Sequence, residues 1–129
     1  MLRIKNLYKS FGGLRAINNV SLEIEKTSIT ALIGPNGAGK TTTLEMIEGL
    51  TDIDSGSVSV NEIDVSSDPY AVKEIIGVQL QSNEYFDALS LKELLVLFGK
   101  LYKNNVDAES LLSKVDLLEK ANAKPEELS

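Results

Sequence analysis

The stretch Gly34-Pro35-Asn36-Gly37-Ala38-Gly39-Lys40-Thr41-Thr42 (GPNGAGKTT) decides how this chain of 129 residues folds. It satisfies the spacing G-x4-G-K-[ST] that is typical of a phosphate-binding loop, the P-loop or Walker A motif. The apolar run 29–33 (ITALI) precedes it and predicts a short buried strand. Residues 40–48 follow it and predict a helix. Because the motif lies between a strand and a helix, which is the context it needs, we favour a genuine phosphate site over a chance match.

The residue types in this loop fit the chemistry of a triphosphate. Gly37 and Gly39 can adopt positive φ, so that backbone N–H groups and the start of the helix turn toward the phosphates. Lys40 can reach the β- and γ-phosphates as a point charge. The Thr41 hydroxyl is placed to bind Mg²⁺, and Thr42 can donate to the α-phosphate. The sequence therefore predicts a site for a nucleoside triphosphate with Mg²⁺.

The composition excludes several other kinds of site. The chain has no cysteine and no histidine, which excludes disulfides, thiol chemistry and the commonest transition-metal ligands. The net charge of −6 makes a nucleic-acid partner a poor match. The N-terminus does not resemble a signal peptide, and no stretch is long and apolar enough for a membrane span. We therefore expect a cytosolic chain that reaches a membrane only by docking to another subunit.

The sequence before and after the loop predicts mainly strands. Residues 2–9 and 14–25 are expected to form two strands joined by Gly12-Gly13, since the second alternates apolar and polar residues. A hairpin is expected for residues 57–60 and 63–65, which flank Asn61-Glu62.

Helical patterns dominate the remainder. Leu44 and Ile47 are expected on one face of the helix after the loop, and Gly49 should end that helix. Asp68-Pro69 opens a short helix that gives way near residue 76 to a strand at 77–80. Ser90 and Glu93 fit a capping box. The helix that follows is expected to carry an apolar face, and Asp107 is expected to cap a last helix. The apolar face consists of Leu91, Leu94, Leu95, Phe98, Leu101 and Tyr102.

The run Ile33-Gly34-Pro35-Asn36-Gly37-Ala38-Gly39-Lys40-Thr41-Thr42 resembles the form of the motif used by ATP-binding cassette (ABC) transporter ATPases, and the resemblance covers essentially the whole chain. It implies an α/β fold, in which a P-loop NTPase core carries an N-terminal antiparallel β subdomain and part of a helical subdomain. Residues 1–81 would form the β subdomain and P-loop core. Residues 82–129 would begin the helical subdomain.

Two further residues match this family. Phe11, in Tyr8-Lys9-Ser10-Phe11-Gly12, is similar to the aromatic residue that stacks on adenine; packing in the core is the alternative. Gln81, which ends the run 76–81 (IGVQLQ), resembles the glutamine of the Q-loop. The resemblance implies that Gln81 touches Mg²⁺ or the attacking water and couples the nucleotide state to movement. A polar surface residue is the alternative, and Gln79 lies on the same side.

Three places bear on how far the resemblance extends. Leu128-Ser129 looks like the first two residues of the signature motif Leu-Ser-Gly-Gly-Gln, so a chain truncated there is expected. The family usually has Gly-Glu where this chain has Thr27-Ser28, and Gly in place of Glu62. If that second turn needs positive φ, Glu62 costs roughly 1 kcal/mol relative to Gly.

The resemblance implies a parent ATPase whose turnover is coupled to transport, with Lys40 and Gln81 in catalytic roles. The family's Walker B acid and switch histidine have no match here, so the chain itself is expected to bind ATP with little or no hydrolysis. It is also expected to expose strand edges and apolar surface, and hence to self-associate.

The implied partners are a transmembrane permease and a second ATP-binding subunit, with the chain on the inner face of the cell membrane. The wording GVQLQS (77–82) is most similar to drug- or antibiotic-export members. Two alternatives stay open. One is a soluble ABC ATPase acting on DNA or ribosomes, and the other is a non-catalytic nucleotide-binding module.

Overall fold

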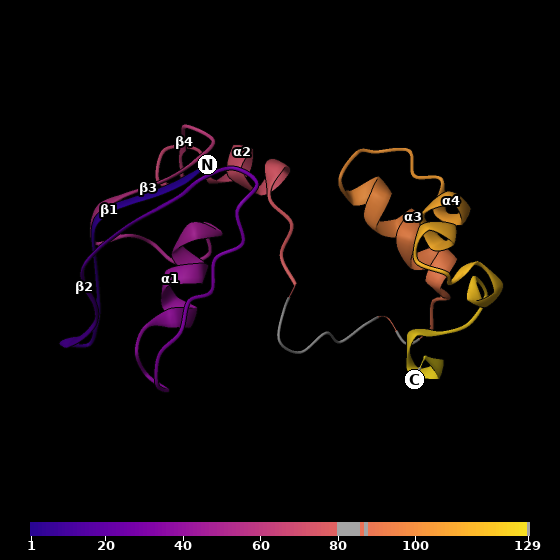
Figure 1. Cartoon of the computed structure of the whole chain (residues 1–129), viewed down its shortest axis with the longest axis horizontal. Helices are drawn as coiled ribbons and strands as arrows, with labels where there is room; N and C mark the ends of the chain where they lie inside the picture. Colours follow the sequence, from indigo (N-terminus) through magenta and orange to yellow (C-terminus); the bar gives the residue numbers. More distant parts are fainter. Residues whose placement is uncertain (80–85, 87, 129) are drawn as a thin grey trace. The chain divides into compact units, whose positions relative to one another are not determined.

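A computed structural model describes residues 1–79, 86 and 88–128. The chain divides into two compact units, Met1–Val78 and Gln79–Ser129, and each is described by itself. Figure 1 shows strands β1–β4 and helices α1 and α2 in the first unit, and α3 and α4 in the second. Within the described residues, no helix has the length and apolar character needed to cross a membrane.

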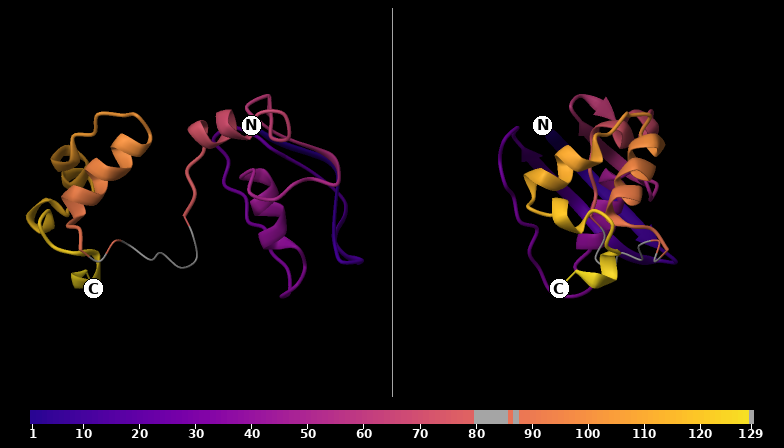
Figure 2. Two further views of the ribbon diagram at one scale, coloured as in Figure 1. Left: turned by 180° about the vertical axis from the view of Figure 1, so that it is seen from behind. Right: turned by 90° about the vertical axis from the view of Figure 1, so that its right-hand side faces the viewer.

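The first unit is built on a four-stranded sheet in the order β2-β1-β3-β4. Its strands are β1 (Leu2–Phe11), β2 (Leu14–Ile24), β3 (Ser55–Val60) and β4 (Ile63–Asp64). Every neighbouring pair is antiparallel, as predicted for the N-terminal subdomain. Two views of the ribbon show this sheet with α1 lying against it (Figure 2).

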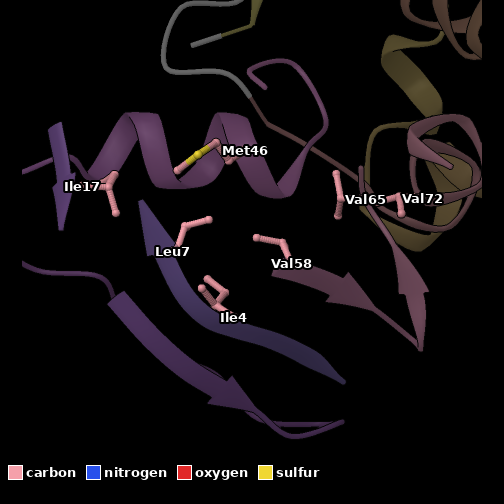
Figure 3. Packing of buried hydrophobic residues seen from close by; sticks show 7 residues of the cluster. All are labelled: Ile4, Leu7, Ile17, Met46, Val58, Val65 and Val72. Atoms are coloured by element: carbon pink, nitrogen blue, oxygen red, sulfur yellow. The ribbon is translucent and has the colours of Figure 1, made fainter. Parts of the chain in front are cut away.

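The core of this unit lies between the sheet and the helices. Ile4 and Leu7 both point into it although they are three residues apart on β1. An irregularity in the pairing accounts for this, because Asn6 has a φ of 45° and the register shifts between Ile4 and Leu7. Figure 3 shows seven side chains of the cluster gathered from both strands and helices. They are Ile4, Leu7, Ile17, Met46, Val58, Val65 and Val72.

Helix α1 (Lys40–Ile47) forms where it was predicted, but it buries a different face. Met46 and Thr43 are buried, whereas Leu44 is 49% exposed. Of the two residues predicted to share a face, Ile47 packs against the core cluster and Leu44 does not, so the prediction is wrong for Leu44. Met46 belongs to the core cluster drawn in Figure 3. The contacts of α1 with β2 and β3 decide which of its residues face inward. Gly49 ends the helix as expected, with a φ of 64°.

Two predicted strands are absent from the described residues. Residues 29–33 have no regular structure, and Ile33 is 89% exposed. Residues 77–79 are also irregular, and Leu80 lies outside the described residues. A strand needs a hydrogen-bonded neighbour. None of the four strands in the described sheet pairs with either segment, so the apolar sequence alone does not make a strand.

The expected short helix at Asp68-Pro69 is present as α2 (Pro69–Ile75). The Asp68 side chain accepts a hydrogen bond from the N–H of Ala71 at 3.0 Å, which caps the first turn. Val72 places this helix in the core cluster of the first unit.

The second unit contains α3 (Leu91–Leu101), α4 (Ala108–Lys114) and two short 3₁₀ helices, Leu118–Lys120 and Pro125–Glu127. The predicted capping box at Ser90 and Glu93 is confirmed, and so is the Asp107 cap of α4. The N–H groups of Leu91 and Lys92 donate to carbonyls of Ala123 and Ala121. The chain after α4 thus packs on the start of α3 and satisfies N–H groups that a helix leaves unpaired.

Apolar side chains remain on the surface of both units, as expected. In the second unit Phe98 is 44% exposed and Leu101 64% exposed, so the apolar face of α3 is only partly covered. Self-association of the chain stays a prediction.

Both departures from the family pattern fall where the backbone is left-handed. Thr27 has a φ of 62° and Glu62 a φ of 71°. Glu62 follows Asn61, with a φ of 47°, in the two-residue turn between β3 and β4. Side chains with a Cβ are strained in this region, and glycine is not.

Replacing Glu62 by glycine is expected to stabilise the chain by about 1 kcal/mol, because Asn-Gly is the preferred pair for this hairpin turn. Urea unfolding followed by circular dichroism measures the difference. The matched control is Glu62→Ala, which removes the same carboxylate but keeps a Cβ. Equal gains for both variants would mean that the charge matters and the backbone strain does not.

A second prediction concerns an ion pair that joins β1 to the turn before β3. Lys9 Nζ lies 2.9 Å from Asp54 Oδ1. The hydrogen bond from Lys9, then that from the Ser10 N–H, holds the pKa of the Asp54 carboxyl below its usual value. A carboxyl whose pKa is lower in the folded state stabilises the fold above its unfolded pKa of about 3.9, and this contribution is lost as pH falls through the folded pKa.

The unfolding free energy of the wild-type chain should therefore exceed that of Asp54→Asn at about pH 7, and the gap should narrow as pH falls below about 3.9. Urea titrations at several pH values measure the gap. Asp52→Asn is the control, because Asp52 is exposed and belongs to none of the ion pairs found in the described parts of the chain. A gap that stayed constant for Asp54→Asn would contradict the prediction.

Candidate phosphate-binding site

The glycine-rich loop joins α1 through Gly39, which occupies the N-cap with φ 82° and ψ 10°. A side chain cannot be added here. A Cβ on Gly39 would lie 2.6 Å from the carbonyl oxygen of Ala16 and 2.5 Å from Cδ1 of Ile17, both on β2. The end of the loop therefore packs directly on the sheet, and both its conformation and its neighbours require glycine.

Lys40, the first residue of α1, folds its side chain back over the loop. Its Nζ donates to the carbonyl oxygens of Gly34 and Pro35, each at 2.7 Å. An ammonium group has three N–H donors. Two of them meet these carbonyls, which leaves one for an oxygen of a bound anion. The positive charge is thus held against the first residues of the loop that spans residues 34–39.

The loop closes on itself between these two ends. The Ala38 N–H donates to the Pro35 carbonyl at 3.2 Å, which makes a turn over residues 35–38 that includes Asn36. Gly37 has a φ of 80°, as predicted, and nothing lies within 4 Å of the position of a Cβ there. A Cβ on Gly34 would lie 3.3 Å from that of Ala38, so this approach is close as well. Small residues thus form a tight loop with room at its outer side.

Three threonines follow Lys40 on α1, and they differ in their surroundings. Thr41 is exposed, Thr42 is half-buried and Thr43 is buried. The Thr43 hydroxyl donates to the Gly39 carbonyl at 2.8 Å, in the same turn whose Thr43 N–H donates to that oxygen at 2.9 Å. Sequence reasoning missed this residue, although a threonine four residues after the N-cap can make such a bond. It fixes the first turn, where Thr41 and Thr42 carry N–H groups without intrahelical partners.

Phe11 lies at the end of β1, where it pairs with Leu14 across the turn Gly12-Gly13. Its side chain is 48% exposed, so the alternative of a core residue is not favoured. The strand that starts at Leu14 reaches Ala16, which contacts Gly39. In Figures 1 and 2 this turn and the start of α1 lie at the same end of the first unit. The structure therefore brings Phe11 and the glycine-rich loop to one hairpin.

One predicted contribution, that of Gln81, is not part of this geometry. Gln81 lies outside the described residues. Within the described ranges, no group of three or more His, Cys, Asp or Glu side chains is arranged to hold a metal ion. Of the two residues predicted to bind the metal, Thr41 lies beside the loop, on the first turn of α1.

A prediction follows from the contact between Gly39 and β2. Gly39→Ala should lower the unfolding free energy by about 2–4 kcal/mol, since it adds a left-handed residue and forces the loop away from the sheet. Gly37→Ala is the matched control, with nearly the same φ but open space, and should cost about 1 kcal/mol. Urea unfolding of the two variants measures the difference. Equal losses would show that the close approach to Ala16 has no energetic weight.

Comparison with known proteins places these features in a family. The chain is 33% identical to the linearmycin resistance ATP-binding protein LnrL of Bacillus subtilis over 134 aligned positions, which cover the whole chain and 43% of that protein. This chain thus spans less than half the length of that relative.

Solved structures agree with this result. An ATP-binding subunit of an ABC transporter superposes on 99% of the chain with a TM-score of 0.83 and 26% identity, covering 55% of that structure. A dimeric structure of the ATP-binding cassette MJ0796, bound to ADP and Pi, superposes on the whole chain with a TM-score of 0.79 and 25% identity, covering 63% of it. These likenesses confirm the α/β fold of a P-loop NTPase, with its antiparallel sheet.

Residues 17–129 match the family described as ABC transporter, which is most of the chain and includes the entire loop. The family likeness, the P-loop and the antiparallel hairpin beside it agree with one another. The chain belongs to the ABC transporter family.

Proposed function

We propose that this chain is the ATP-binding portion of an ABC transporter ATPase, and that residues 34–42 hold the phosphates of ATP. The observation that carries the proposal is the position of the Lys40 ammonium against the loop, 2.7 Å from the carbonyl oxygens of Gly34 and Pro35. A compact cation at the start of a helix is a good partner for a polyphosphate, because the helix end adds partial positive charge.

Each residue of the loop has a distinct role in this proposal. The loop backbone at Gly34, Pro35, Asn36, Gly37, Ala38 and Gly39 surrounds the β-phosphate. Lys40 binds the β- and γ-phosphates, and Thr42 donates to the α-phosphate. Phe11 stacks on the adenine, for which a half-exposed planar ring is suited. The shared hairpin supports this division, because Phe11 ends β1 and the loop packs on Ala16 of β2 through Gly39.

The donor set fits a hard cation such as Mg²⁺. The Thr41 hydroxyl is exposed on the first turn of α1, beside the loop, and supplies one oxygen. Mg²⁺ takes its remaining oxygens mainly from phosphates and water in such sites, so a single protein hydroxyl suffices here. When bound, Mg²⁺ would neutralise charge on the phosphates. Gln81 is proposed as the second protein oxygen and as the residue that senses the γ-phosphate.

The whole protein is proposed to couple ATP binding and hydrolysis to transport, with Lys40 and Gln81 acting in catalysis. Its partners would be a transmembrane permease and a second ATP-binding subunit, at the inner face of the cell membrane. The linearmycin resistance protein favours the export branch, and the dimeric cassette favours pairing of two subunits. Neither of these two proteins favours action on DNA or ribosomes. Residues 1–81 and 82–129 are proposed as the β-and-core part and the start of the helical part.

Calorimetric titration tests the nucleotide site directly. We expect Mg-ATP to bind the chain, and Lys40→Met to weaken the binding by roughly 10- to 100-fold. A hydrogen bond to a charged group contributes about 1.5–3 kcal/mol, and each 1.4 kcal/mol is about tenfold. Lys26→Met is the matched control, since it removes the same charge from an exposed turn. The proposal is wrong if ATP gives no binding signal, or if Lys40→Met binds it as well as Lys26→Met does.

A further inference from the structure

Lys9 is a charged residue on the face of β1 that points into the core. The register of β1 shifts at Asn6, and beyond that shift both Leu7 and Lys9 are buried, whereas Phe11 at the end of the strand is half exposed. Lys9 is only 9% exposed. Its partner Asp54 is more open, with a side chain 44% exposed, so the ion pair lies at the edge of the core. A charge that is partly withdrawn from water still favours a paired, hydrogen-bonded position. We therefore ask which contacts hold a lysine at this largely buried position.

Asp54 supplies the partner and also fixes the backbone around it. Its Oδ1 accepts from Lys9 Nζ at 2.9 Å, and its Oδ2 accepts from the Ser10 N–H at 2.8 Å. The Asp54 N–H donates in turn to the Tyr8 carbonyl at 3.3 Å. One residue thus binds three consecutive residues of β1, directly before Phe11. The low pKa of the Asp54 carboxyl, caused first by Lys9, is consistent with a carboxylate that stays ionised.

The ammonium of Lys9 also lies over the ring of Phe11, 5.2 Å from its centroid. This distance is within the range in which a cation is attracted to an aromatic face. A ring has two faces, and the ammonium covers one of them. The exposed part of Phe11 therefore offers the other face to a planar ligand.

We propose that Lys9 is a positioning residue for base recognition, which orients the Phe11 ring through its ammonium and leaves one face to stack on the base. The inference rests on the proposed function, because it assigns a device to the adenine end of the same site. Lys9 also draws π-electron density toward its own side of the ring. The free face is then less negative and a better partner for an electron-rich purine.

The test compares two ligands that differ in the base. Inorganic tripolyphosphate carries the phosphates alone, whereas ATP carries the base as well. We expect Lys9→Met, which keeps an unbranched apolar side chain, to weaken Mg-ATP binding by about 2- to 10-fold. Binding of Mg-tripolyphosphate should be unchanged. Lys9→Arg keeps the cation and should restore ATP affinity to within about twofold.

A double-mutant cycle separates action through the ring from support of the fold. In a Phe11→Ala chain, adding Lys9→Met should cause no further loss of ATP affinity. Lys73→Met is the matched control, because Lys73 Nζ lies 5.7 Å from the ring centroid of Tyr70 in the same kind of pair. Lys73→Met should change neither the affinity for Mg-ATP nor that for Mg-tripolyphosphate. If circular dichroism shows that Lys9→Met does not fold, Asp54→Asn takes its place, with the same ATP-selective loss expected.

The outcomes distinguish this inference from the proposed function. Equal weakening of ATP and tripolyphosphate by Lys9→Met, or a full effect that persists in Phe11→Ala, overturns the role of Lys9 and leaves the phosphate site standing. A loss in Lys9→Arg equal to that in Lys9→Met also overturns it. If neither ligand binds the wild-type chain, the proposed function fails and the inference fails with it.

Discussion

The contact between Gly39 and β2 is the constraint on which the rest of the first unit depends. Gly39 adopts a left-handed conformation at the start of α1. It also has to lack a Cβ, because the carbonyl oxygen of Ala16 lies only 2.6 Å from the position that a Cβ would take. This approach sets the start of α1 against the sheet, and Met46 then reaches the core beside Leu7 and Val58. It also directs the first turn of α1 and Lys40 toward the loop. The contact between Gly39 and β2 thus determines both how α1 packs on the sheet and where Lys40 lies relative to the loop.

The same hairpin connects the two ends of the proposed nucleotide. Phe11 pairs with Leu14, and Ala16 lies two residues further along β2. The ring that would meet the base and the backbone that supports the loop are therefore separated by a short, hydrogen-bonded stretch. Strand pairing, and not an irregular connection, therefore sets the spacing between the Phe11 ring and the part of β2 on which the loop packs. Asp54 adds a second connection, because its carboxylate accepts hydrogen bonds from Lys9 and Ser10, the two residues before Phe11.

Features that depend on neighbours in the sequence could be predicted. The caps at Ser90 and Asp107 form hydrogen bonds with residues only three positions later. The glycines of the loop adopt the left-handed conformation that their residue type allows. Features that depend on distant partners could not be predicted with the same success. The run 29–33 was predicted as a strand from its apolar residues, yet a strand exists only beside another strand. The buried face of α1 was wrong for a similar reason, since the sheet selects Met46 over Leu44.

Lys9 shows why part of the site could not be found from sequence. A lysine two residues before an aromatic residue on a strand indicates only that both share a face, and lysines are usually exposed. Two facts from the fold change that interpretation. The irregularity at Asn6 turns this face inward, and Asp54 arrives from 45 positions later in the chain. The largely buried stem of Lys9 and the hydrogen bond of its ammonium to Asp54 together place that ammonium 5.2 Å from the centre of the Phe11 ring. Burial of the stem and pairing of the charge, both products of the fold, thus give this lysine a defined place.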